Sequence, residues 1–182
     1  PERGRNTRFF SFADTVKARS YQGTDESHGW MGITFQHKPK AEPSEIILHI
    51  RMLDTENVQQ QEALGIIGVN LVYGAMLLFR QPETLILSLM DELSAERIEI
   101  DMIRFNGPAF KGVDNRLMSL QLVQHGLSEA AMFQANGEVV QPSELFYKRS
   151  VLVERGSFRP ATRVSIDMLE RALVQFRNEA KA

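Results

Sequence analysis

The sequence predicts an α/β fold with a mixed sheet: antiparallel strands at the N-terminal end, a buried central helix, and a parallel second half built from βαβ units. Three observations predict this class. Apolar and polar residues alternate in three early runs, an almost continuous apolar stretch fills the middle of the chain, and strand-like and helix-like patterns alternate after it.

The composition indicates one globular domain spanning residues 1–182. The chain is 43% hydrophobic and 24% charged, with 21 basic and 23 acidic side chains. A formal net charge of -2 argues against general nucleic-acid binding, and no charge block indicates a membrane surface. The sequence has no cysteine, which excludes disulfides and thiolate chemistry and suits a cytoplasmic location. Because the chain begins at Pro1, we expect it to be a fragment of a longer protein.

The first three strands are expected at residues 8–16, 31–35 and 45–53. In the third, Leu48 and Ile50 lie on one side, whereas His49 and Arg51 lie on the other. A Pro-rich connection at 36–45 suits a hairpin-like return. The three runs therefore predict the antiparallel section of the sheet.

The central part of the chain predicts two helices. Residues 55–79 begin with helix formers and become apolar on nearly every side from Leu64 onward, which is typical of a helix in the buried centre of a fold. The apolar part is shorter than the roughly 20 residues of a bilayer span. Glycines within it favour close packing of another element. A second helix begins at Pro82 and carries a stripe of leucines, Leu85, Leu89 and Leu93.

The second half alternates between strands and helices. A fourth strand at 97–105 alternates until Ile103, where the pattern slips and indicates a β-bulge. A helix at 115–124 has Asp114 as its expected N-cap and Gly126 as its expected C′ residue. Further elements are expected in order: a strand at 129–133, a short helix from Ser143, a strand at 150–154, and an amphipathic helix at 162–176.

Several stretches taken together resemble a known bacterial family. These are "FADTVKARSYQGT", "HGWMGI", "QQQEALGIIGVNL", "GVDNRLMSLQLVQ", "VVQPSELFYK" and "VLVERGSFRP". The family consists of larger hypothetical proteins often labelled nicotinate-nucleotide adenylyltransferase and sometimes TonB-dependent receptor. The resemblance implies a larger parent chain and nucleotide chemistry, with a nucleotidyl- or other group transferase as the enzyme class. It assigns no catalytic residue, because the Gly-x-His motif and the Ser/Thr-rich signature of that enzyme class do not occur.

Two loops are the main candidates for a ligand site. In a parallel sheet, loops that follow strand C-termini meet at one edge, where helix N-termini favour anions. We therefore expect a small anionic ligand, such as a nucleotide or a phosphorylated compound, at the C-terminal edge of the sheet. The expected ligand-binding residues are Gly107, Lys111, Gly112, Asn115, Arg116, Arg155, Gly156, Ser157 and Arg159. The alternative is that glycines turn the chain while the cations are solvated or paired.

Proton transfer is assigned to His28 or Asp114. His28 lies in the polar loop "YQGTDESHGW" beside carboxylates and Trp30, although such a loop is more often simply polar. His49 is expected to be outward or hydrogen-bonded. Glu99 and Asp101 share one strand face about 7 Å apart, a spacing compatible with paired-carboxylate chemistry. A solvated sheet face gives the same pattern and is the preferred interpretation. No metal site is predicted, and the sequence identifies no cofactor.

A different class of function is also compatible with the sequence. The chain could be a non-catalytic assembly or ligand-sensing domain. The glycine-rich helix and the stripe from Leu85 to Leu93 would then pack against the rest of the parent chain or in a homo-oligomer. Stabilisation by anions would favour the first function, and a concentration-dependent oligomer would favour the second.

Overall fold

The computed structural model describes residues 7–17 and 27–179. The chain forms two compact units that divide between Gln141 and Pro142.

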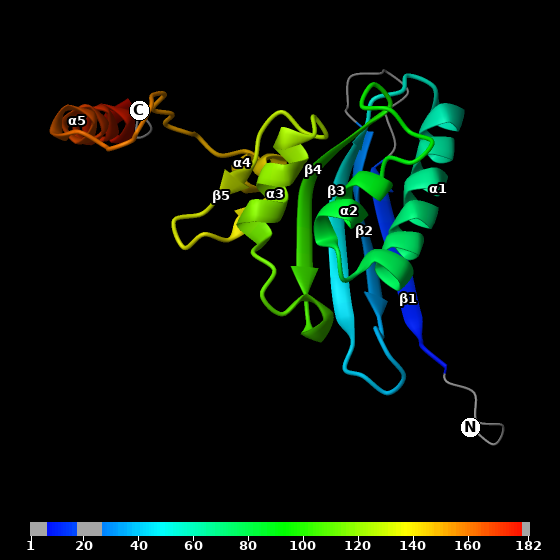
Figure 1. Ribbon diagram of the computed structural model, residues 1–182. Helices are drawn as coiled ribbons and strands as arrows, with labels where there is room; N and C mark the ends of the chain where they lie inside the picture. The colour runs from blue at the N-terminus through cyan, green and yellow to red at the C-terminus, as the bar shows by residue number, and fades with distance from the viewer. Residues whose placement is uncertain (1–6, 18–26, 180–182) are drawn as a thin grey trace. The chain divides into compact units, whose positions relative to one another are not determined.

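The first unit is built on a four-stranded sheet in which every neighbouring pair is antiparallel (Figure 1). The strands follow the order of the sequence: β1 (Phe10–Lys17), β2 (Ser27–Phe35), β3 (Ser44–Met52) and β4 (Ile98–Asn106). The expectation of antiparallel N-terminal strands is confirmed. The strand expected at 31–35 is longer, because it begins at Ser27 and includes His28 and Trp30.

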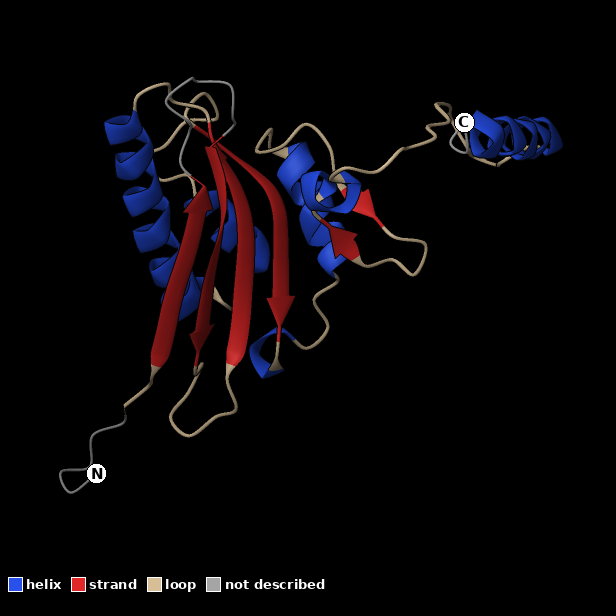
Figure 2. Cartoon of the chain, turned by 180° about the vertical axis from the view of Figure 1, so that it is seen from behind, coloured by secondary structure: helices blue, strands red, loops and turns tan. Residues whose placement is uncertain are grey.

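Helices cover one face of this sheet, and the other face is open (Figures 1 and 2). The helical elements of the first unit are α1 (Asn57–Tyr73), a π-helical continuation η1 (Gly74–Leu78), α2 (Pro82–Ser88), a 3₁₀ turn η2 (Pro108–Phe110) and α3 (Asn115–Gln124). Strand residues that face the helices are apolar and buried, with Ile33, Leu48 and Ile100 at 0–1% exposure. Burial of this apolar layer is the main driving force of the fold.

The expectation of a buried central helix is wrong. Ile67 and Leu71 of α1 are buried, but Val69 and Tyr73 are 69% and 50% exposed. The helix therefore lies on the surface of a two-layer structure and buries one side only. By length and hydropathy alone the helix Asn57–Leu78 could span a bilayer, yet its inner side packs on the sheet.

Gly68 of α1 and Gly74 of η1 serve packing inside this unit, as expected, whereas Gly65 has open space around its Cα. A Cβ atom at Gly68 would lie 3.3 Å from the Phe12 ring, and one at Gly74 would lie 2.9 Å from Leu85 Cγ. Leu85 and Leu89 are themselves fully buried in the core. Leu85 of α2 and Leu89, which follows the helix, therefore pack within their own unit.

The β-bulge expected near Ile103 is confirmed. Pairing of β3 with β4 shifts register between His49 and Ile50, where β4 carries one additional residue. His49 pairs with Met102 and Ile50 pairs with Ile100, so Asp101 has no partner in the register. The bulge places the Asp101 carboxylate beside the His49 ring.

The parallel second half is not present. Met132–Phe133 (β5) pairs with Val139–Val140 (β6) in an antiparallel two-stranded sheet. The chain reverses at Gly137, which has a φ of +86°. The Gln134 N–H donates to the Glu138 carbonyl at 2.9 Å, and the Gly137 N–H donates to the Gln134 carbonyl at 2.9 Å. A parallel pair would need a long crossover, whereas this tight turn permits only antiparallel pairing.

The second unit contains two helices joined by an irregular segment. They are α4 (Pro142–Phe146) and α5 (Arg163–Glu179), and both helices were expected. The strand expected at 150–154 is not formed, and these residues have no regular structure. Among the described residues of α5 none is buried, because Ile166 and Leu169 find no covering element within this unit.

Candidate functional site

The loop from Phe105 to Arg116 joins β4 to α3, as the sequence predicts. Asp114 is the N-cap of α3, and its side chain accepts a hydrogen bond from the Arg116 N–H at 2.9 Å. Gly126 follows the C-cap with a φ of +69°. Both helix boundaries are therefore confirmed.

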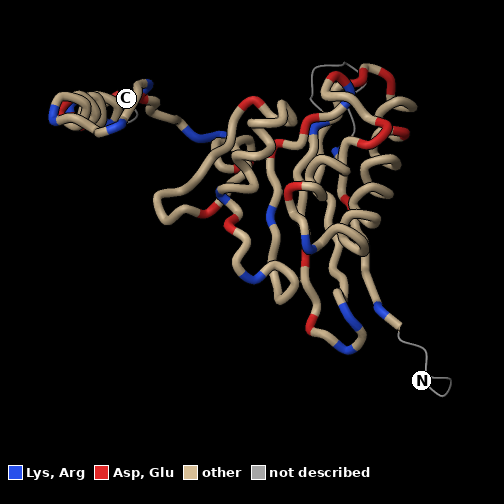
Figure 3. The backbone as a smooth tube through the Cα atoms, in the orientation of Figure 1, with Lys and Arg blue, Asp and Glu red and all other residues tan. Residues whose placement is uncertain are grey.

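Part of this loop lines a pocket of about 720 Å³ with the β5–β6 hairpin. Its walls are Arg104, residues 112–116 and residues 136–140. Of the expected ligand residues, Gly112, Asn115 and Arg116 lie here, whereas Gly107 and Lys111 do not line it. The lining includes Asp114 and Glu138 beside Arg104 and Arg116, so the pocket is not walled by cations alone. Along the backbone of this unit, Lys and Arg are interspersed with Asp and Glu (Figure 3).

Side chains of the loop are largely engaged with one another. Asn115 bonds both the N–H and the carbonyl of Phe105, at 2.8 and 3.0 Å. Gly107 has a φ of +94°, and a Cβ there would lie 2.7 Å from Ser44 Cα. These two residues hold the loop on the sheet, which is a structural task.

Asp114 and Arg116 form an ion pair at 2.7 Å in the same loop. The hydrogen bond from the Arg116 side chain lowers the pKa of Asp114 from 3.8 to about 2. The Asp114 carboxyl group therefore carries no proton at neutral pH. This state suits helix capping better than proton donation.

The second candidate loop belongs to the other unit. Arg155, Gly156, Ser157 and Arg159 are all exposed in the irregular segment between α4 and α5. The sequence predicted both loops at the C-terminal edge of a parallel sheet. The sheet is antiparallel and this segment follows no strand, so that reason for placing the two loops together does not apply.

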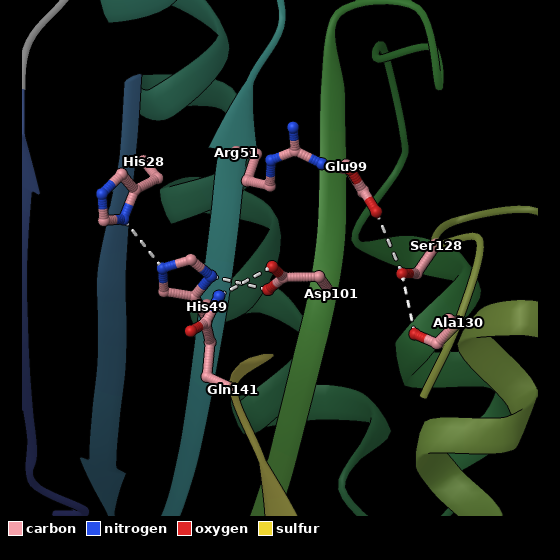
Figure 4. Close-up of polar contacts among 8 residues, drawn as sticks. All are labelled: His28, His49, Arg51, Glu99, Asp101, Ser128, Ala130 and Gln141. Atoms are coloured by element: carbon pink, nitrogen blue, oxygen red, sulfur yellow. Dashed lines mark hydrogen bonds and ion pairs between the residues drawn. The ribbon is translucent and has the colours of Figure 1, made fainter. Parts of the chain in front are cut away.

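The open face of the sheet holds a different cluster of polar side chains (Figure 4). Strand alternation directs His28, His49 and Asp101 to this face, away from the helices. His49 is 0% exposed, although no helix lies over this face, and its ring contacts His28, Trp30 and Asp101. Buried titratable groups of this kind concentrate at functional sites.

The cluster is a linear chain of hydrogen bonds across β2, β3 and β4. His28 Nδ1 lies 3.1 Å from His49 Nε2, and His49 Nδ1 lies 2.6 Å from Asp101 Oδ1. Gln141 follows β6 and donates from Nε2 to Asp101 Oδ2 at 3.1 Å. We call His28, His49 and Asp101 the relay, with Gln141 as the residue that holds its acidic end (Figure 4).

The contacts restrict where protons can sit. A carboxylate only accepts, so His49 donates from Nδ1 to Asp101. When His49 is neutral, its Nε2 accepts from His28 Nδ1–H, and the Nε2 of His28 then carries a lone pair. When His49 is protonated, its Nε2 donates to His28 instead. The hydrogen bonds of the relay thus persist in both charge states, which is the requirement for moving a proton along it.

A second polar group lies beside the relay. Arg51 donates to Glu99 Oε2 in a short ion pair, and Ser128 Oγ lies 3.0 Å from Glu99 Oε1. The Glu99 and Asp101 side chains are only 17% and 11% exposed. The preferred interpretation of these carboxylates as a solvated face is therefore wrong.

Next to the relay the open face has a shallow depression of about 300 Å³. Gly32 and Ala13 form its floor, and Trp30 and Ile47 flank it. Trp30 also contacts the relay, because its ring meets the His49 ring edge-on with centroids 4.9 Å apart. A ligand in the depression would therefore touch a side chain that packs on the relay.

Local sequence explains how His28 reaches this position. Gly29 follows it and faces β1, where a Cβ would collide with the Thr15 carbonyl. Glycine at this point lets β2 pair with β1 up to His28, so His28 lies in the strand and not in the expected loop. Among the described residues no three histidine or carboxylate groups gather as a metal site.

Comparisons with protein-family models, with curated proteins and with solved structures returned no match. The site is therefore interpreted from its geometry alone. His28 was expected from the sequence, but His49, Asp101 and Gln141 were not assigned to a site. The one available signal was that His49, Glu99 and Asp101 occupy the polar sides of predicted strands, since neighbouring polar sides can meet across a sheet.

Proposed function

We propose that this protein binds a small ligand on the open face of its sheet and exchanges a proton with it through His28. The observation that carries the proposal is the buried His49, held between His28 and the Asp101 carboxylate. A carboxylate behind an imidazole fixes its tautomer and stabilises the imidazolium that forms on proton uptake. In the relay this effect reaches His28 through a second imidazole.

The chemistry proposed is general acid–base catalysis. As a base, His28 takes a proton at Nε2 while its Nδ1–H continues to donate to His49. The resulting positive charge is then balanced by Asp101 through His49. Such positioned proton transfer contributes about 10²–10⁴-fold to a rate. Bound against Trp30, the ligand would lie one strand-face position, about 7 Å, from His28.

The intrinsic fluorescence of the protein tests this proposal directly. Trp30 is the one tryptophan of the chain, so ligands on the open face should change its emission. We expect compounds that raise the melting temperature to change Trp30 fluorescence and to shift the His28 ring signals in NMR spectra. His28→Gln should retain the fluorescence response and lose turnover. Stabilising ligands that leave both Trp30 and His28 unaffected would contradict the proposal.

An anion site at the start of α3 is a second candidate function, and the pocket beside Gly112 favours it. Arg104 is half exposed there and lies 4.0 Å from its nearest acid, Glu45. Gly112 has a φ of +89° with open space around its Cα, so its backbone can approach a ligand. These features support the small anionic ligand expected from the sequence.

Inorganic phosphate and nucleotides test the anion site. Stabilisation should weaken with added salt and disappear in Arg104→Gln, without a change in Trp30 fluorescence. Arg80→Gln is the matched control, since Arg80 lies outside this pocket against the Phe79 ring. Equal loss in both variants would show that only overall charge matters and would exclude the site.

A further inference from the structure

Strand β1 is the edge of the sheet, and its exposed side has the properties of an interface. Among the described residues, β1 pairs with β2 alone. Each of its residues is exposed, including Phe10 at 52%, Phe12 at 37% and Val16 at 36%. These three side chains lie on the helix side of the sheet. Their partners on β2, such as Phe35 and Ile33, are buried on that side. The core of the first unit is thus uncovered at this edge.

The direction of the β1 backbone groups follows from one hydrogen bond. The Gln36 N–H donates to the Phe9 carbonyl at 2.9 Å, in register with the β1–β2 pairing. In an antiparallel ladder alternate residues bond the partner, so Ser11, Ala13 and Thr15 face β2. The N–H and C=O groups of Phe10, Phe12, Asp14 and Val16 therefore point outward, which is a template for another strand.

We propose that a second copy of this chain pairs with β1 in antiparallel fashion, about a two-fold axis through Ala13, to form a continuous sheet. An edge of this kind is self-complementary, because the same outward groups meet in both copies. On the helix side the register places Phe10 opposite Val16 of the second copy, which forms an apolar pair on each side of the axis, and it places Phe12 opposite Asp14. Ser11 lies opposite Thr15 of the second copy on the open side.

The choice of Ala13 as the axis has a steric and an electrostatic reason. The N–H and C=O groups of Ala13 point toward β2, so the two Ala13 residues would form a non-hydrogen-bonded pair across the new interface. Residues in such a pair approach most closely, with Cα atoms about 4.5 Å apart. A small side chain suits this position. An axis through Asp14 would instead place two carboxylates opposite each other, which is unfavourable.

The exposed area is of the right order for a homodimer. Phe9, Phe10, Phe12 and Val16 together expose roughly 350 Å², about half of the 800 Å² that each partner buries in a standard interface. The outward strip of β1 backbone adds to this area. Pairing would also bring the two open-face depressions side by side, since Ser11, Ala13 and Thr15 line them.

Oligomeric state and a backbone substitution test the proposal. Light scattering should give twice the 20.7 kDa of the chain at high concentration. Asp14→Pro removes an outward N–H but no bond to β2, and should yield a folded monomer with unchanged circular dichroism. Asp14→Asn keeps the N–H and should remain dimeric. A monomeric wild-type protein, or a dimeric Asp14→Pro variant, would overturn the proposal.

A single introduced cysteine tests the register, because the chain has none of its own. In Ala13→Cys the two thiols should face each other across the axis at a Cα separation suited to a disulfide, and mild oxidation should cross-link most of the protein. Thr34→Cys lies on the same open face but on β2, and should cross-link at least tenfold more slowly. Equal rates at both positions would contradict pairing through Ala13.

Discussion

The two faces of the four-stranded sheet consist of the same strands but are stabilised by different interactions. The face beneath α1 and α2 is apolar, with Leu48 and Ile50 at 0% exposure, and burial of area stabilises it without regard to direction. The open face is stabilised by directional contacts, such as the 2.6 Å bond between His49 and Asp101. The comparison shows that side chains of this protein are buried for two different physical reasons, apolar packing and directional hydrogen bonding. Substitutions can distinguish the two.

The largest expected effect concerns the covered face. Leu48→Ala should reduce the free energy of unfolding by about 2–5 kcal/mol, because it leaves a cavity in a closely packed layer. Ile47 is its neighbour on the open face and is partly exposed. Ile47→Ala should cost about 1 kcal/mol or less. Urea denaturation of both variants measures the difference, and equal losses would mean that the open face is covered in solution.

A smaller effect is expected where a hydrogen bond on the open face is broken. Asp101→Ala leaves the Nδ1–H of a fully buried His49 without its acceptor, which should cost about 1–3 kcal/mol. Glu45 is also an acid on the open face, but its side chain is 37% exposed and its Oε1 lies 4.0 Å from Arg104 Nη2. Glu45→Ala should change the stability by less than about 0.5 kcal/mol. Chemical denaturation of both variants measures these changes. An Asp101→Ala variant as stable as the wild type would show that the relay does not stabilise the fold.

Two buried serines sharpen the comparison further. Ser128 Oγ lies within hydrogen-bond distance of Glu99 and of the Ala130 carbonyl. Ser119 on α3 is 1% exposed, and its Oγ has no partner among the described residues. Ser128→Ala should therefore destabilise by about 1 kcal/mol, whereas Ser119→Ala should stabilise by about 0.5 kcal/mol. Opposite signs in thermal unfolding are the expected outcome, and a loss in both variants would contradict it.

The smallest expected effect lies outside both faces, in the exposed Asp114–Arg116 pair. The pKa of Asp114 is lowered on folding, so the pair stabilises the protein above the ordinary value of 3.8 and loses this contribution as the pH falls toward about 2. Asp114→Asn keeps a good N-cap and removes the charge. The gap between wild-type and variant urea midpoints should close over this pH range. A gap that persists at the lower limit would have another cause.

The helix-covered face could be predicted well from the sequence, and the open-face site could not. Alternation of Leu48 and Ile50 with His49 and Arg51 identifies the strand and its apolar side, since the two-residue period is a local property. The slip at Ile103 indicates the bulge in the same way. What brings Asp101 to His49, however, is the pairing of strands about 50 residues apart, and the register of that pairing is not a local property.

Strand pairing in the second half of the chain was also not predictable from the local sequence. Alternating short strands and helices predicted parallel pairing, yet the turn at Gly137 closes an antiparallel hairpin. Likewise, Gly107 and Gly112 look equivalent in the sequence, but only Gly107 packs against the β3 backbone. In the second half the strand expected at 150–154 and the parallel pairing are both missing, whereas at Gly107 the local turn was predicted and its packing partner was not.

The sequence by itself determined the antiparallel start of the sheet, the apolar side of each strand, the cap of α3 and the candidacy of His28. These features depend on periodicity and on single-residue conformational preference, which act within a few residues. The tertiary structure alone decided that His28, His49 and Asp101 form one chain of hydrogen bonds and that β1 is left at an open edge. Both follow from which strands become neighbours, and that depends on the burial of the whole apolar layer at once.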